Sequence, residues 1–476
     1  MLLKRTLLYL PSQILGPLSQ LLAIVLWTFF CSKETIGFVT LVTTQQELTR
    51  SIFVTWWSHY LLRFVNDDAV NKSDVLSTNC WYMLLSSVLQ ALFTVGLLFY
   101  ILGADINVTL CLVTVMFVVL RSFNQHNLTL AVSNDLTIIF NSLSLIGPVV
   151  GLIIGMVLLY FFGDNFVYPI LGFAIAEFLS FCLLIFFNRK RTFSFKINHA
   201  VFYSAFKFGA PFILSGAFSW LALNIPRYFI EFKLGLGSVG EFAVGFGLGL
   251  RAASMASMVV TSAGLPLAIK KMQTEGINSA MNQLSDNFSL LIFVMFPALL
   301  GLLAISNDLV VLAIAEEYIK VTLLILPWAL LSGGVFAVIS HYLYHYFFIV
   351  SKTIYIVFLD FFLALITFLL CLYFVDSKGV VGGVMSMAIA SLSVSIFLLS
   401  YLVIKTEFIF PTIDFCKISI ASLFMYFVVI FFSDVFITSP LSVVFDVLVG
   451  VFAYSFIVSI LYFNKIRLFY SSRYSI

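Results

Sequence analysis

Four arginines lie inside apolar stretches of the sequence that are long enough to cross a membrane: Arg50, Arg121, Arg227 and Arg251. A charged side chain at the centre of a membrane helix costs about 2.5–3.5 kcal/mol on the insertion scale, so four unpaired arginines would cost on the order of 10 kcal/mol. We therefore expect them to line a polar cavity or to pair with acids. A planar guanidinium with five donors suits bidentate binding of phosphate or carboxylate.

Two of the arginines belong to polar runs. The run 43–51, "TTQQELTRS", contains Gln46, Glu47 and Arg50, and the last two share a helix face because they are three residues apart. This spacing predicts that the run lines a cavity, and the alternative is a Glu47–Arg50 pair that only joins two helices. Arg121 begins "RSFNQHN", in which Gln125 lies one turn further on. We expect Arg121 and Gln125 to line the same cavity.

The other two arginines differ in their neighbours. Arg251 has no acid three or four residues away, so pairing within its own helix does not explain it. At 1.5 Å per residue its depth agrees with that of Arg50 within about 3 Å. Arg251 is therefore the strongest single ligand candidate. Arg227 has Glu231 four residues on, so a structural pair and a ligand contact both stay open.

Acids inside apolar stretches could carry a coupling proton, and Glu177 and Asp360 are the candidates for that role. A contact that holds helices together is the alternative for each acid. Asp446, in the last apolar stretch, is expected to serve helix packing.

The elements that must position these residues are membrane helices. Of the 476 residues, 62% are hydrophobic and 10% are charged, whereas a soluble domain carries about 25% charged residues. Spans of about 20 apolar residues predict an all-α polytopic membrane protein with about 14 transmembrane helices. Most loop lysines and arginines fall on one side, which predicts cytoplasmic N and C termini. The predicted spans are 7–31, 37–61, 77–102, 108–131, 137–162, 166–187, 208–232, 240–265, 287–306, 321–345, 353–374, 380–404, 415–433 and 441–463.

Glycines mark a repeated joint and two packing surfaces. Pro11 and Pro211 each open an apolar run, and these runs end at the similar segments Glu34–Val39 and Gly237–Phe242, so the chain resembles a duplication. Small residues four apart let helices approach closely, and we expect such contacts at two places. These are Gly147, Gly151 and Gly155, and then Gly245, Gly249 and Ala253.

The segment Gly235-x-Gly237-x-x-Gly240 matches a dinucleotide-binding motif in letters, but that motif needs a preceding strand. We interpret it as a turn between two membrane helices, with Ser238 and Glu241 forming a capping box. Single cysteines and the absence of a P-loop motif indicate no metal site, no cofactor and no catalytic residue, so an enzyme is not expected.

One region resembles a known family. Residues 206–250 resemble the seventh-to-eighth-helix region of Wzx-type polysaccharide flippases, which transport O-antigen or capsule repeat units and belong to the multidrug/oligosaccharidyl-lipid/polysaccharide (MOP) exporter superfamily. "SKETIGFVT" and "LLRF" resemble that family's first outer loop and second helix end. Pro226 stands where the family often has an acid before the arginine. The matching elements are Gly209-x-Pro211, Ser219-Trp220, Arg227-Tyr228 and Leu234-Gly235…Val239-Gly240.

The resemblance implies a fold and a function. It implies two pseudo-symmetric six-helix lobes, 1–198 and 199–408, followed by two further helices in 409–476. It also implies a flippase that moves a polyprenyl-pyrophosphate-linked oligosaccharide from the inner to the outer leaflet of the bacterial cytoplasmic (inner) membrane. A polysaccharide polymerase and a chain-length regulator would be partners. The expected substrate-binding residues are Arg50, Arg121, Arg251, Arg227, Glu47, Gln46 and Gln125.

Two alternatives come from other classes. A multidrug/cation antiporter of the same superfamily would need carboxylates in its cavity, yet the first predicted span, 7–31, contains no acid. A membrane-embedded glycosyl or polyprenyl transferase would need a sizeable loop outside the membrane, and the sequence offers none.

Overall fold

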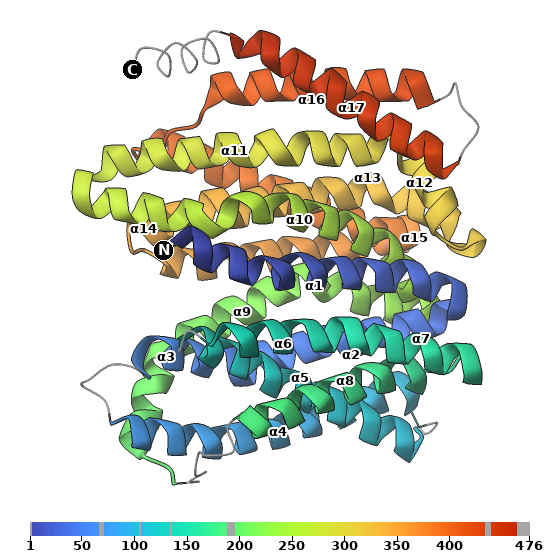
Figure 1. The fold of residues 1–476 in the computed structure, drawn as a ribbon, viewed down its shortest axis with the longest axis vertical. Helices are drawn as coiled ribbons and strands as arrows, with labels where there is room; N and C mark the ends of the chain where they lie inside the picture. The colour runs from blue at the N-terminus through green and yellow to red at the C-terminus, as the bar shows by residue number, and fades with distance from the viewer. Residues whose placement is uncertain are drawn as a thin grey trace. The chain divides into compact units, whose positions relative to one another are not determined.

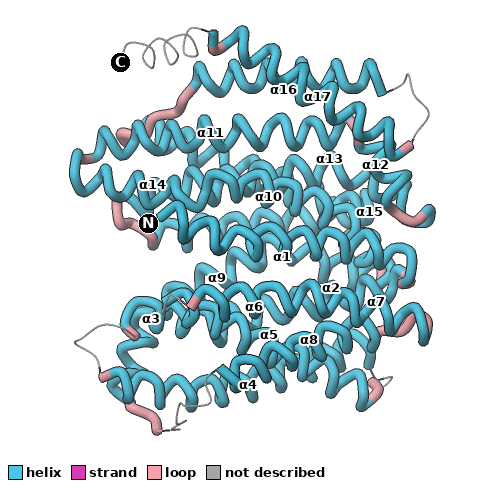
Figure 2. Tube along the Cα trace, in the orientation of Figure 1, coloured by secondary structure: helices cyan, strands magenta, loops and turns pink. Residues whose placement is uncertain are grey.

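The computed structural model describes residues 2–65, 71–103, 106–133, 136–187, 196–433 and 439–463, and these residues form helices and loops without a strand (Figure 2). The basic residues at 189–191 and after residue 463, which contributed to the predicted orientation, lie outside the described residues.

Helices account for every predicted span, which confirms the all-α polytopic membrane fold (Figure 1). Among the described residues, ten helices are long and apolar enough to cross a membrane. Helix α15 contains two predicted spans. They are separated at Gly379, where the backbone leaves the helical region (φ 60°, ψ −137°). The helices are α1 (Leu2–Phe30), α2 (Lys33–Arg50), η1 (Ser51–Thr55), α3 (Trp56–Phe64), α4 (Lys72–Leu102), α5 (Val108–Ser133), α6 (Thr137–Leu145), η3 (Ile146–Val150), α7 (Gly151–Phe162), α8 (Val167–Phe187), α9 (His199–Leu234), α10 (Leu236–Glu275), α11 (Ile277–Ala304), α12 (Ser306–Ala313), α13 (Glu316–Val338), η4 (Ile339–Leu343), α14 (Tyr344–Ile349), α15 (Ile354–Lys405), α16 (Thr412–Ser433) and α17 (Pro440–Leu461).

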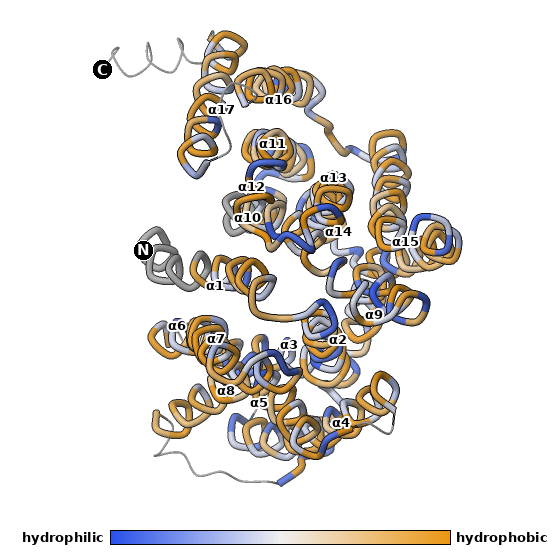
Figure 3. The backbone as a smooth tube through the Cα atoms, turned by 90° about the vertical axis from the view of Figure 1, so that its right-hand side faces the viewer, coloured by the Kyte–Doolittle hydropathy of each residue, from blue (hydrophilic) through white to orange (hydrophobic). Residues whose placement is uncertain are grey.

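Most residues of these helices are hydrophobic, as the mainly orange tube in Figure 3 shows. Large hydrophobic side chains are exposed on several of them, among them Ile138 at 75%, Leu441 at 82% and Phe452 at 76%. A soluble protein rarely exposes such extended apolar surface. These faces therefore fit contact with lipid.

The chain divides into two compact units. The first comprises Met1–Ala243 and Asp360–Phe368, and the second comprises Val244–Leu359 and Leu369–Ile476. The lobes predicted at 1–198, 199–408 and 409–476 follow a different division and stay predictions.

Close packing between helices depends on glycines in both units. In the first, a Cβ added to Gly172 of α8 would lie 2.4 Å from the backbone nitrogen of Gly155 in α7. In the second, a Cβ on Gly249 of α10 would lie 2.5 Å from the Ala329 Cβ of α13. Both predicted small-residue surfaces are thus confirmed as packing surfaces, since a larger side chain has no room there.

The two similar joints of the repeat contact each other inside the first unit. A Cβ on Gly37 would lie 2.0 Å from the Leu236 carbonyl oxygen, and a Cβ on Gly240 would lie 2.1 Å from the Lys33 carbonyl oxygen. The contact is reciprocal, because each glycine packs against the segment that precedes the other. Lys33 Nζ and Glu241 Oε1 form an ion pair of 2.6 Å beside it.

This arrangement corrects the predicted capping box. Gly235, at φ 84°, ends α9, and α10 begins immediately at Leu236, so Ser238 already lies within the helix. Its hydroxyl donates to the Leu234 carbonyl at 3.3 Å. Glu241 pairs with Lys33 and does not cap its own helix, because the α2 segment packs directly against this turn.

Candidate functional site

Arg50 ends α2 at a change of helix type. The following segment, η1, is a π-helix, and the Thr55 hydroxyl donates to the Arg50 carbonyl at 3.1 Å, five residues back. Arg50 Nη1 in turn donates to Thr55 Oγ1 at 3.3 Å. Single π-helical turns inside α-helices are frequent at functional sites. The sequence analysis did not detect this turn, because no residue type marks it.

Gln46 connects α2 to α5. Its side chain is fully buried, and its Nε2 donates to Ser122 Oγ at 3.0 Å and to Gln125 Oε1 at 3.2 Å. The structure thus brings together two predicted site residues, Gln46 and Gln125. They fix how α2 sits against α5, and each is one turn from an arginine, Arg50 or Arg121.

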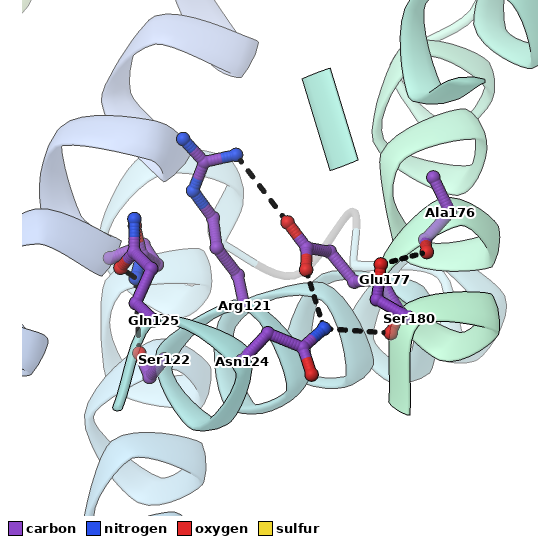
Figure 4. A network of polar contacts seen from close by, with 8 residues as sticks. Arg121, Ser122, Asn124, Gln125, Ala176, Glu177 and Ser180 are labelled. Atoms are coloured by element: carbon purple, nitrogen blue, oxygen red, sulfur yellow. Dashed lines mark hydrogen bonds and ion pairs between the residues drawn. The ribbon is translucent and has the colours of Figure 1, made fainter. Parts of the chain in front are cut away.

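Arg121 and Glu177 form the next contact, between α5 and α8 (Figure 4). Arg121 Nη1 lies 3.7 Å from Glu177 Oε1, which is longer than a good charge-assisted hydrogen bond. Asn124 binds Glu177 more tightly, since its Nδ2 donates to Glu177 Oε2 at 2.7 Å and to the Glu177 carbonyl at 2.8 Å. The structure therefore gives Glu177 a helix-joining contact. The sequence analysis missed Asn124, although its spacing of three from Arg121 was an available signal.

Charges gather in the first unit around Glu47. The exposed Glu47 carboxylate attracts Arg50 and Arg227, while Arg121 repels Arg50. Among the described residues no direct ion pair joins Glu47 to Arg50. Glu47 therefore acts through space on the arginines around it.

Arg227 is held within its own helix and by an aromatic ring. Its Nη1 donates to Asn224 Oδ1, and its Cζ lies 5.5 Å from the centre of the Phe242 ring. Glu231, the acid four residues on, instead interacts with the Tyr100 hydroxyl of α4. The contacts around Arg227 therefore favour positioning over pairing with Glu231.

Two predicted residues remain, Asp360 and Arg251. Asp360 belongs to the first unit, where its Oδ2 accepts hydrogen bonds from Ser215 at 3.1 Å and Ser219 at 2.7 Å. Arg251 lies on α10, in the second unit. All other predicted site residues lie in the first unit.

His126 forms a buried network in the first unit. Its Nδ1 lies 2.8 Å from Ser58 Oγ and its Nε2 lies 3.0 Å from Asn79 Oδ1. The same Asn79 oxygen accepts from Trp57 Nε1 at 2.7 Å, so it is an acceptor and His126 Nε2 carries a proton. Helices α3, α4 and α5 are joined through this network.

Metal ligands are not assembled in the part of the chain that the structure describes, where no group of three His, Cys, Asp or Glu side chains could hold an ion. The polar groups around Glu47 are guanidinium groups, amides and the exposed Glu47 carboxylate itself.

Comparison with known proteins identifies the family and the fold. The sequence model of a family described as "Polysaccharide biosynthesis protein" matches residues 30–323, more than half of the chain. No curated protein matches. A solved structure of "Lipid II flippase MurJ, inward closed conformation" has a TM-score of 0.77 at 19% identity, covering 98% of this chain and 100% of that chain. An inward-facing multidrug resistance MATE family transporter of the MOP superfamily has a TM-score of 0.54 at 13% identity, covering 83% and 96%. At these identities the likeness establishes the fold alone.

Proposed function

Because the chain belongs to this family of polysaccharide biosynthesis proteins, we propose that it moves a lipid-linked oligosaccharide across the membrane and holds the anionic headgroup with arginines. The finer proposal is a polyprenyl-pyrophosphate-linked O-antigen or capsule repeat unit, moved from the inner to the outer leaflet of the bacterial inner membrane by alternating access. The similar protein MurJ is named as a lipid II flippase, so this fold is compatible with a lipid-linked substrate.

One observation carries the proposal: Arg50 and Arg121 each have a buried guanidinium donor without a partner in the described part of the chain, and their positive charges repel each other. Arg50 Nε and Arg121 Nε are buried without a hydrogen-bond partner among the described residues. Leaving a buried charged donor unsatisfied costs more than an ordinary hydrogen bond contributes. An anion bound to both guanidinium groups would satisfy these donors and offset the repulsion, and pyrophosphate has the oxygen geometry for it.

Neighbouring groups complete the proposed site. Glu47 balances the positive charge of Arg50 and Arg227 until the anion binds. Gln46 Oε1 is buried and has no hydrogen-bond partner among the described residues, so it can accept a hydrogen bond from a sugar hydroxyl. Arg251 of the second unit stays a predicted ligand residue.

The membrane potential supplies a driving force. A potential that is negative inside favours outward movement of an anion by about 2.3 kcal/mol per charge per 100 mV. A headgroup with two charges would gain roughly 4–5 kcal/mol by the same arithmetic. The alternative is proton coupling through Glu177 or Asp360, and each of these carboxylates already accepts hydrogen bonds from neighbouring side chains. We expect flipping to slow when the potential is collapsed at constant proton gradient, and an unchanged rate would assign the driving force to protons.

The test is a flipping assay with the full chain in liposomes and a fluorescent polyprenyl-pyrophosphate-linked oligosaccharide. Arg50→Gln and Arg121→Gln should each lower the flipping rate by at least about tenfold, since a lost charge-assisted hydrogen bond costs about 1.5–3 kcal/mol. Arg63→Gln is the matched control, because Arg63 is exposed at the end of α3 and packs on Phe64 and Phe208. It should flip substrate at the wild-type rate.

Three outcomes would contradict the proposal. Equal flipping rates for Arg121→Gln and wild type would contradict binding of the headgroup by the arginines. A chemically altered oligosaccharide after incubation would indicate a transferase. Uptake of a cationic dye without flipping of the oligosaccharide would indicate an antiporter.

A further inference from the structure

A cavity lies in the second unit between α11, α16 and α17, with a volume of about 370 Å³. Its wall is made almost entirely of apolar side chains from these three helices. Two glycines, Gly301 on α11 and Gly450 on α17, help to make the space. Pockets of this size and character accommodate small organic molecules.

Asp446 on α17 is the exception in this apolar wall. It is 1% exposed, and neither carboxyl oxygen has a hydrogen-bond partner among the residues that the structure describes. Two further polar side chains line the cavity: the Tyr454 hydroxyl donates to the Phe293 carbonyl at 2.8 Å, and Ser455 is exposed. A buried carboxylate without a partner is strongly unfavourable, and a cationic group within the cavity would stabilise its charged form.

The surroundings favour a positive ligand. Asp308 on α12 is close enough to interact electrostatically with Asp446, so the negative potential there comes from two acids. The cavity also reaches exposed apolar residues of α17, Val447 and Val451, on a face suited to lipid. These side chains suit the apolar body of a ligand.

We propose that this cavity binds an organic cation with an apolar body, an amine or quaternary ammonium whose charge pairs with Asp446 and whose apolar part packs against the wall between α11, α16 and α17. Charge complementarity decides against an anion. The unsatisfied carboxylate decides against an uncharged lipid chain, which offers Asp446 no partner. The cavity lies in the second unit, whereas Arg50 and Arg121 lie in the first, and neither proposal depends on the other.

A pair of ligands with the same shape tests the proposal. Benzyltrimethylammonium carries the charge, and neopentylbenzene replaces its nitrogen with carbon. With the purified full chain in lipid nanodiscs, the cation should bind at least about tenfold more tightly than its neutral counterpart, because the low dielectric strengthens the ion pair. Asp446→Asn should remove that preference while neopentylbenzene binds as before.

A second variant fills the space without touching the charge. A Cβ on Gly301 would meet Met425 at 3.5 Å, an ordinary contact, so Gly301→Leu should fold and place its side chain in the cavity. It should weaken binding of both ligands, whereas Gly96→Leu, on an open surface of α4, should weaken neither. Equal affinity of wild type for the two ligands would overturn the proposal, as would cation binding that survives in both Asp446→Asn and Gly301→Leu.

Discussion

Replacing Gly240 with alanine should separate the facing ends of α2 and α10. The added methyl group would lie 2.1 Å from the Lys33 carbonyl oxygen, a backbone atom that cannot rotate away. Restoring ordinary contact requires the two helices to move apart by about 1.3 Å, and packed interiors resist such a change. The same movement would separate Gly37 from the Leu236 carbonyl.

Two energies oppose each other in this variant. Overpacking typically costs about 1–3 kcal/mol. Alanine gains about 1 kcal/mol over glycine inside a helix. Because the clash is with backbone atoms, the steric cost should exceed the gain in helix propensity. We therefore expect the arrangement in which α2 and α10 are in contact to be destabilised by about 1–2 kcal/mol, which lowers its population about 5- to 30-fold.

The assay is crosslinking between cysteines placed at residues 33 and 241 in a variant that lacks the six native cysteines. A short bifunctional thiol reagent should link the parent efficiently and the Gly240→Ala variant at least about fivefold less. Gly96→Ala is the control, because a Cβ there meets nothing within 4 Å. It should keep the parent yield.

Non-additivity gives a sharper criterion. Gly37→Ala should act like Gly240→Ala, and the double variant should cost less than the sum of the two, because one separation relieves both clashes. If Gly240→Ala crosslinks as well as the parent and melts at the same temperature, the reasoning about this joint is refuted.

Two further predictions concern polar contacts. A double-mutant cycle with Lys33→Ala and Glu241→Ala should give a coupling free energy of about 0.2–1 kcal/mol by denaturation in detergent, since both side chains are partly exposed; a coupling near zero would show that the pair contributes nothing. His126→Phe should lower stability by about 1–3 kcal/mol in thermal melts, because Ser58 and Asn79 each lose a buried hydrogen bond; an unchanged melting temperature would contradict the network.

The sequence determined which segments cross the membrane and which of their residues are unusual there. Apolar length and charge are local properties, so the spans could be located without knowing any contact. The spacing of Gly147, Gly151 and Gly155 likewise predicted a packing surface, because residues four apart share a helix face. The polar character of the run around Glu47 and Arg50 could also be recognised from the sequence, because it depends only on residue type.

Tertiary structure alone decided which partner each of these residues meets. Gln46 bonds Gln125, and Glu177 is held by Asn124, because of how each helix is rotated against its neighbours. Hydropathy contains no information on that rotation. The same holds for Asp446, which the sequence placed in the last span as a packing residue. Only the approach of α11 and α16 to α17 shows that its carboxylate is buried beside a cavity and lacks a partner among the described residues.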